Sequence, residues 1–283
     1  MTFSIVGFDP EEKEWGIAVQ SKFLGVGAVV PFAKAGVGAV ATQSYANTAY
    51  GPQALELMAE GKSASEVMEL ITKDDLDKEM RQVGLIDASG QPATFTGTYC
   101  YDWAGGMTGE HFAAQGNILV GENTVKAMAD TFTSTQGSLA KRLLAALDAG
   151  QEAGGDSRGQ QSAALLVVKE KGGYGGYNDR YIDLRVDDHQ QPIKELIRLY
   201  GMQQLYFAPS KPENIVAIEG EVREEVIKHL QRLGYLKAQP ANGEELHKAF
   251  TAYLHTENFE EREQEAGKID LDVLEFMKNQ KSG

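Results

Sequence analysis

The sequence predicts an α+β protein in which two antiparallel sheets face each other between two layers of helices, with a small helical domain after them. Hairpin-linked apolar segments and recurring helix pairs fill the first part of the chain. The segment Pro209–Pro212 then leads into a charged, glycine-poor remainder with helical periodicity. A doubly wound parallel sheet would need strict strand–helix alternation, which the hairpins contradict. We expect domains at 1–204 and 213–283.

Local patterns place each element of the first domain. The chain begins with an expected hairpin whose strands, Thr2–Phe8 and Trp15–Gln20, flank the turn Asp9–Glu14. Helix Ser63–Thr72 begins with the Ser63/Glu66 spacing of a capping box. The other expected strands are Gly25–Phe32, Gly36–Gln43, Arg81–Asp87, Ala93–Tyr99, Phe112–Leu119, Ser162–Lys169 and Tyr181–Val186. The other expected helices are Pro52–Glu60, Glu122–Phe132, Ser138–Gly150 and Pro192–Tyr200.

The C-terminal remainder predicts three short helices around a small core. Glu221–Leu233 and Glu244–His255 each carry apolar residues at helical spacing, and Asn242 is the expected N-cap of the second. Asp270 is the expected cap of a last helix that carries Val273, Leu274 and Met277. A module with so few large apolar groups typically binds a ligand rather than performing catalysis.

Composition excludes several classes of function. The 283 residues include 27 Lys and Arg against 41 Asp and Glu, a net charge of −14 that disfavours nucleic acid and anionic membranes as partners. The single cysteine, Cys100, excludes an internal disulfide and cysteine-rich metal sites. No apolar run of about 18 residues is present, so no membrane span is expected. The N-terminus has no signal-peptide pattern, so a cytoplasmic location is expected.

Metal and phosphate chemistry have little support. The five histidines are scattered, and no Gly-x-Ser-x-Gly motif is present. The glycine-rich run Gly172–Asp179 has no strand–loop–helix context for a phosphate. A metal-dependent hydrolase would require Asp183, Asp187, Asp188 or His189 to converge. The run Asp187–His189 lies where a strand ends and a helix starts, and acidic caps are routine there. We therefore expect neither a metal nor an organic cofactor.

Thr2 is the position where the sequence suggests chemistry. A small residue after the initiator methionine normally permits removal of Met1, which would leave Thr2 with a free α-amine beside its hydroxyl. That amine has an ordinary pKa of about 7.7–8.0, so it can accept the hydroxyl proton near neutral pH. Its place at the head of a core strand is unusual for a free terminus. Thr2 is therefore a candidate nucleophile that carries its own base.

Many ordered motifs now support a family resemblance. They are TFSIVGFDP, WGIAVQSKFLGVGAVVPFAKAGVGAVATQ, YGPQALELM, RQVGLIDASG, TGEHFAAQGNIL, GGDSRGQQSAALLVV and NDRYIDLRVDDH. Together they resemble the bacterial domain-of-unknown-function family 1028, over nearly all of residues 2–200. The family is assigned by fold to the N-terminal-nucleophile (Ntn) hydrolase superfamily. The resemblance implies an α-β-β-α sandwich and amide hydrolysis through an acyl-enzyme, and it implies no particular substrate.

The resemblance assigns roles to individual residues. Thr2 matches the superfamily nucleophile, and proteasome-like members place a lysine beside it. Lys22 is the first candidate and Lys34 the second, because strand register decides which ammonium reaches Thr2. Candidate oxyanion donors are Asn117, Gln43 and Ser21. Candidates for orienting the amine or holding a carboxylate are Asp156, Arg158, Ser162, Asp179 and Arg180, which are otherwise surface ion-pair residues.

The C-terminal motifs VREEVIKHLQRLGYL and GKIDLDVLEFM resemble three-helix peptidoglycan-binding modules. Wall peptidoglycan lies outside the cytoplasm, so a cytoplasmic wall fragment or another peptide-like ligand would fit the expected location better. The leading hypothesis is an Ntn amidohydrolase for a small peptide-like or amino-acid-derived amide. The alternative is a non-catalytic binding or scaffolding protein that keeps the fold, and self-association into a homo-oligomer is open in both.

Overall fold

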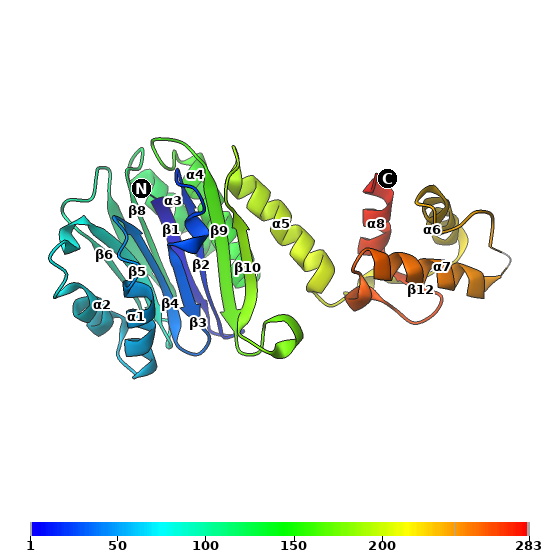
Figure 1. Cartoon of the computed structure of the whole chain (residues 1–283), viewed down its shortest axis with the longest axis horizontal. Coiled ribbons are helices and arrows are strands. Elements are labelled where there is room, and N and C mark those ends of the chain that lie inside the picture. The colour runs from blue at the N-terminus through cyan, green and yellow to red at the C-terminus, as the bar shows by residue number, and fades with distance from the viewer. Residues whose placement is uncertain (1, 241, 282–283) are drawn as a thin grey trace. The chain divides into compact units, whose positions relative to one another are not determined.

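The computed structural model describes residues 2–240 and 242–281. The chain forms two compact units that meet in sequence between Arg198 and Leu199. The first contains two antiparallel sheets with helices, and the second is mostly helical (Figure 1). The expected α+β class is confirmed. No described helix has the length and apolar character required to cross a membrane.

The larger sheet of the first unit has six strands in the order β10-β9-β2-β1-β8-β7. Every neighbouring pair is antiparallel, with the N-terminal strand β1 paired to both β2 and β8. The strands are β1 Thr2–Asp9, β2 Glu14–Ser21, β7 Gly105–Gly109, β8 Phe112–Asn117, β9 Ser162–Lys169 and β10 Arg180–Val186.

The smaller sheet has four antiparallel strands in the order β3-β4-β5-β6. Its strands are β3 Pro31–Lys34, β4 Gly38–Ser44, β5 Arg81–Asp87 and β6 Pro92–Thr96. Apolar side chains from both sheets, among them Val6, Ile17, Ala41 and Ile86, form one buried cluster between them. Burial of this cluster holds the sheets face to face.

Helices cover the outer face of each sheet (Figure 1). Helices α1 (Tyr50–Ala59) and α2 (Ala64–Thr72) share a buried cluster with the four-stranded sheet. Helices α3 (Asn123–Ser134) and α4 (Leu139–Glu152) pack on the six-stranded sheet. There Gly7 of β1 lies so close to Phe132 that an added Cβ would come within 2.9 Å of the ring. The glycine is therefore required for this helix–sheet spacing.

The expected strand Gly25–Phe32 is wrong. Gly25 adopts a left-handed conformation with φ of 64° and begins a short 3-10 turn, Val26–Ala28, and β3 begins only at Pro31. The Ser162 hydroxyl accepts a hydrogen bond from the Val26 amide at 3.0 Å, which stabilises the turn. The apolar residues between Gly25 and Val30 therefore belong to the loop that follows β2 and not to a strand.

Two further elements differ from the expectation. Strand β7 was not expected, because three glycines in Gly105–Gly109 obscure the alternation that marks a strand. Helix α5 extends from Pro192 to Phe207, beyond the expected end at Tyr200, because the helix accommodates Gly201 and no proline follows before Pro209.

The second unit packs helices around a short two-stranded sheet. The sheet pairs β11 (Ile215–Ala217) with β12 (Lys268–Asp270), which the sequence analysis did not anticipate. Asp270 caps the last helix as expected, since its side chain accepts a hydrogen bond from the Asp272 amide at 2.9 Å. The helices of this unit are α6 Gly220–Arg232, α7 Gly243–Thr256 and α8 Leu271–Asn279.

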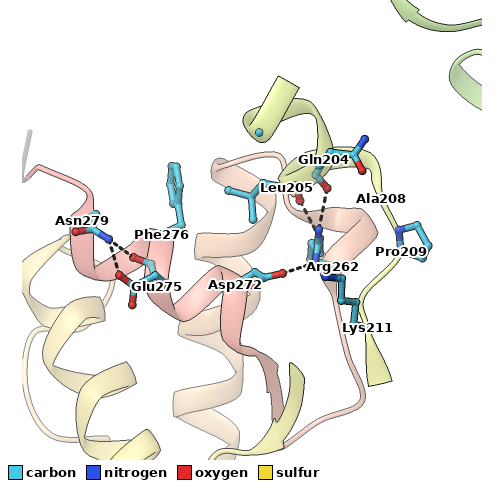
Figure 2. Close-up of a pocket in the computed structure, with 11 residues that line it drawn as sticks. Gln204, Leu205, Ala208, Pro209, Lys211, Arg262, Asp272, Glu275, Phe276 and Asn279 are labelled. Carbon is cyan, nitrogen blue, oxygen red and sulfur yellow. Dashed lines mark hydrogen bonds and ion pairs between the residues drawn. The ribbon is translucent and has the colours of Figure 1, made fainter. Parts of the chain in front are cut away.

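A buried arginine organises a pocket in the second unit (Figure 2). Arg262 is 5% exposed and donates to the carbonyls of Gln204 and Leu205, both at 2.8 Å. It also forms an ion pair of 2.7 Å with the fully buried Asp270 carboxylate. Burial alone would raise the pKa of Asp270, but hydrogen bonds from Ser210 and Arg262 hold it below its usual range. Arg262 therefore stabilises the unit, and its guanidinium is occupied by these protein groups.

Candidate functional site

Strand register brings the predicted residues of β1, β2, β8 and β9 to one end of the six-stranded sheet. Thr2 pairs with Ser21 on one side and Asn117 on the other, and Ser21 in turn pairs with Ser162. Gln43 lies near the end of β4 in the opposing sheet, and its side-chain amide reaches the Thr2 carbonyl. Ser21, Asn117 and Gln43, from distant parts of the sequence, thus lie next to Thr2, and Ser162 lies beside Ser21.

The Thr2 side chain borders a small cleft of about 170 Å³. Thr2 is 4% exposed, and its hydroxyl Oγ1 donates to Ser21 Oγ at 3.0 Å. The polar side of the cleft is formed by Thr2, Ser21 and Gln43, and an apolar wall is formed by Val26, Val29 and Val30. A hydroxyl-bearing residue at the lining of a cleft has the chemistry to attack a carbonyl group placed there.

A network of buried amides surrounds the Thr2 carbonyl. Gln43 Nε2 and Asn117 Nδ2 donate to it at 3.3 and 3.4 Å. The same two nitrogens each donate to Gln82 Oε1 at 2.8 Å. Each amide group has two hydrogens, so both hydrogens of Asn117 and of Gln43 already have acceptors. In this arrangement these side chains hold the β1 backbone in place.

Asp156 anchors both cations that line the cleft. Its carboxylate is fully buried and accepts from the Lys22 amide at 3.1 Å. The Arg158 guanidinium donates to both of its oxygens, at 3.0 and 2.7 Å, in a bidentate ion pair. Asp156 therefore positions Lys22 and Arg158 at the cleft and does not itself line it. Lys22 directs its ammonium to the Gln160 carbonyl at 3.3 Å.

Ser162 has a structural role in this arrangement. Its hydroxyl accepts from the Val26 amide and donates to the Phe23 carbonyl, so it ties the loop that follows β2 to the start of β9. The residue is fully buried and does not line the cleft. These contacts place Ser162 in support of the loop that carries the apolar wall and outside the lining of the cleft, where a substrate-binding residue was expected.

Three predicted site residues lie at the other end of the sandwich. Lys34 pairs with Gly38, at the far end of β4 from Gln43. Arg180 pairs with Val168 at the far end of β9 from Ser162 and forms an ion pair with Asp183 at 2.6 Å. The Asp179 carboxylate accepts from the Ala35 amide at 2.9 Å. Lys34, Asp179 and Arg180 are therefore removed from the site.

The residues considered for a metal do not converge. Asp183 is paired with Arg180 and Arg185, whereas Asp188 accepts from the Gln161 side chain at 3.1 Å and His189 Nδ1 accepts from the Gln191 amide at 3.0 Å. Within residues 2–240 and 242–281, no group of three or more His, Cys, Asp or Glu side chains could hold a metal ion. Cys100 is buried, and its thiol donates to the Arg81 carbonyl at 3.3 Å.

Sequence reasoning missed two features of the site. Gln82 is the shared acceptor of the amide network, yet it lies within an ordinary strand pattern that gives no signal for such a role. Ser44, the last residue of β4, and Ile118, directly after β8, adopt left-handed backbone conformations with φ of 70° and 50°. Backbone strain in residues other than glycine often accompanies functional sites. Both positions are at the Thr2 end of their strands.

Comparisons with known proteins identify the family and show a similar fold. Residues 206–277 match the family model "Putative peptidoglycan binding domain". No curated protein matches the chain. Among solved structures, the crystal structure of protein SPO2555 from Silicibacter pomeroyi, described as a DUF1028 protein, is similar, with 28% sequence identity and a TM-score of 0.66. The match covers 79% of this chain and 92% of that one. Residues 2–196 match the model "Family of unknown function (DUF1028)", and the chain therefore belongs to the DUF1028 family.

Proposed function

We propose that this protein is an N-terminal-nucleophile amidohydrolase that cleaves an amide bond in a small peptide-like or amino-acid-derived substrate through Thr2. The observation that carries the proposal is the position of the Thr2 hydroxyl, which borders a cleft at the head of a core strand. The packing of two facing sheets between helices agrees with this class of fold. Met1, whose removal the proposal requires, lies outside the described residues.

The chemistry follows from the two groups that Thr2 would carry. Its α-amine takes the proton from Oγ1 while Oγ1 attacks the carbonyl carbon of the substrate. The amine then passes that proton to the departing nitrogen as the C–N bond breaks, which leaves an ester on Thr2. Water, deprotonated by the same amine, hydrolyses the ester and releases the acid. No external oxidant, reductant or metal takes part in these steps.

Lys22 is the remaining lysine candidate near Thr2. It lines the same cleft, and its backbone is fixed by the buried Asp156 carboxylate. A nearby ammonium disfavours a second positive charge, so it would lower the pKa of the Thr2 α-amine and increase the basic, neutral fraction. Lys22 therefore tunes the base in this proposal.

The oxyanion donors need a revised assignment. Gln43 and Asn117 have both amide hydrogens engaged, and Ser21 accepts from Thr2. Phe23 and Ala46 line the cleft, and their backbone N–H groups have no acceptor within residues 2–240 and 242–281. Backbone amides of this kind stabilise developing negative charge without reorganisation. We assign them as the first candidates for that role.

The test compares two preparations of the full chain. One begins with Thr2, and the other retains Met1, with intact mass confirming each. Both are treated with an amide-directed electrophile such as a β-lactone, and labelled peptides are identified by mass spectrometry. The proposal expects an adduct on Thr2 only in the first preparation and none in its Thr2→Ala variant. Equal labelling of both preparations, or no adduct at Thr2, would refute it.

Two observations favour a second candidate function, a binding protein that retains the fold without hydrolysis. The amides next to Thr2 are fully engaged with each other and with the β1 backbone, which suits a structural role. The match of residues 206–277 to a peptidoglycan-binding model supports a wall fragment as ligand of the domain at 213–283. Titration of the full chain with soluble muropeptides tests this role. Saturable binding without turnover would support it, and absence of binding would exclude it.

A further inference from the structure

The cleft beside Thr2 is suited to a small apolar group. Its volume of about 170 Å³ is below the roughly 300–1,000 Å³ of pockets that enclose drug-sized ligands. Val26 and Val30 are 1% and 3% exposed, and Val29 completes the wall beside the Thr2 hydroxyl. These branched side chains make that wall apolar, while the cations Lys22 and Arg158 line other parts of the cleft. A short aliphatic chain attached to the attacked carbonyl matches this space and chemistry.

A second, polar groove begins on the other side of Lys22. It has a volume of about 490 Å³ and is lined by Lys22, Gln160, Gln161, Asp188 and His189, together with two further glutamines, Gln190 and Gln191. Lys22 lines both this groove and the cleft. The Gln161 amide donates to the Ser21 carbonyl at 3.1 Å, so the groove wall is attached to the strand residue that contacts Thr2. The cleft and the polar groove therefore adjoin at Lys22.

The polar groove offers a ligand the positive charge of Lys22, whereas the Asp188 carboxylate in the same groove already accepts from the Gln161 side chain. Lys22 Nζ donates only to the Gln160 carbonyl, and it forms no ion pair within residues 2–240 and 242–281. Arg158, the other cation of the cleft, is already paired with both oxygens of Asp156. A carboxylate on the ligand would therefore meet Lys22 first. Side-chain amides of the glutamines supply donors and acceptors for the rest of a peptide-like group.

We propose that the site recognises an N-acyl amino acid, with a short aliphatic acyl group in the cleft and the carboxylate of the amine-side amino acid at Lys22 in the polar groove. This inference rests on the proposed function, because it takes the Thr2 hydroxyl as the point between the two parts. It adds the substrate class, which the family does not supply. It also gives Lys22 a second role, as the group that selects a carboxylate.

The test measures binding rather than turnover. The full-length Thr2→Ala variant is titrated by calorimetry with N-isobutyryl-alanine, with its C-terminal carboxamide and with N-benzoyl-alanine. The carboxylate ligand should bind, and the bulkier benzoyl ligand should bind at least about tenfold more weakly. Adding Lys22→Gln should weaken the carboxylate ligand about two- to fivefold, as expected for an exposed ion pair, and leave the carboxamide unchanged.

A matched pair of variants tests the apolar wall. Val29 is half-buried and lines the cleft, whereas its neighbour Ala28 is exposed and does not. Val29→Phe should reduce isobutyryl-alanine binding at least about tenfold, and Ala28→Phe should leave it unchanged. Intrinsic tryptophan fluorescence verifies that both variants are folded.

Three results would overturn the inference: no binding of isobutyryl-alanine, equal binding of the benzoyl ligand, or an equal effect of Lys22→Gln on acid and carboxamide. These results are separable from failure of the proposed function. The binding experiment uses protein without the nucleophile, so ligand selectivity without Thr2 labelling would refute hydrolysis alone. Thr2 labelling without ligand selectivity would refute the substrate class alone.

Discussion

Replacement of Gln82 by methionine tests whether the buried amide network holds the Thr2 end of the sandwich together. Gln82 is fully buried and lies between the two sheets, where its Oε1 accepts from Gln43 and Asn117, each at 2.8 Å. Its Nε2 donates to the Gly116 carbonyl at 2.7 Å. Methionine has a similar volume and fills the space, but it can neither accept nor donate these bonds.

The expected cost follows from the groups left without partners. Two buried amide hydrogens lose their acceptor, and each unsatisfied group costs about 1–3 kcal/mol. Part of this is recovered because the buried Gln82 amide itself is removed. We therefore expect Gln82→Met to lower the free energy of unfolding of the first unit by about 3 kcal/mol. Gln82→Glu keeps an acceptor but places a carboxylate in the core, and we expect it to cost at least as much.

Urea unfolding followed by tryptophan fluorescence measures this change selectively. The chain has only two tryptophans, Trp15 and Trp103, and both belong to the first unit, so the signal reports that unit. The control is Gln53→Met on the exposed face of α1, which should change stability by less than about 0.5 kcal/mol. If Gln82→Met cost no more than this control, the network would contribute nothing and our account of the site would be wrong.

Three further predictions follow from other contacts. Asp75→Asn should cost about 2 kcal/mol at pH 7, because Arg81 and then Tyr50 donate to this carboxylate. Those bonds hold the pKa of Asp75 in the folded protein below the usual value of about 3.9. The stability that the Asp75 carboxylate contributes should therefore be complete above pH 4 and should be lost as the pH falls through its folded pKa, which urea midpoints measured across this pH range would show. Gly84→Ala should cost about 1–3 kcal/mol by tryptophan-monitored unfolding, since the new Cβ would lie 1.9 Å from Gln115 Oε1. Arg262→Met should leave the buried Asp270 unpaired, cost about 3–5 kcal/mol, and speed hydrogen exchange across α8.

Much of the fold was predictable because local patterns and tertiary packing agree. The N-terminal hairpin has apolar residues on both faces of each strand, which is what a strand buried between a sheet and a helix layer requires. The capping box at Ser63 forms as predicted, with Glu66 donating its amide to the serine hydroxyl and accepting from the Ser63 amide. By contrast, the apolar residues of Gly25–Phe32 predict a strand, but the left-handed conformation of Gly25 turns the chain at the start of this segment.

The sequence predicted which residues of the site lie at strand ends, but it could not predict which strand ends lie next to one another. Thr2, Ser21, Gln43 and Asn117 were correctly expected at strand ends, and register brings them together. The sequence could not decide between Lys22 and Lys34 as the lysine near Thr2. The pairing of β3 with β4, which is not a local property of the sequence, places Lys34 at the other end of the sheet. Gln82 gave no signal, because a glutamine within a strand pattern normally indicates an outward-facing residue.

The amide network also allows a test of which donors would stabilise an oxyanion, the side-chain amides of Gln43 and Asn117 or the backbone amides of Phe23 and Ala46. If Gln43 and Asn117 stabilised an oxyanion, each would have to release a hydrogen from Gln82 or from the Thr2 carbonyl during the reaction. In the Gln82→Met variant, one hydrogen of each of these two amides has no acceptor and is free to bind the oxyanion. If these amides form the oxyanion hole, the folded variant should therefore label at Thr2 at least as fast as the wild-type protein. If backbone amides at Phe23 and Ala46 stabilise the charge, disorder of the β1 backbone in that variant should slow labelling instead. The direction of the change therefore identifies which groups face the reacting carbonyl.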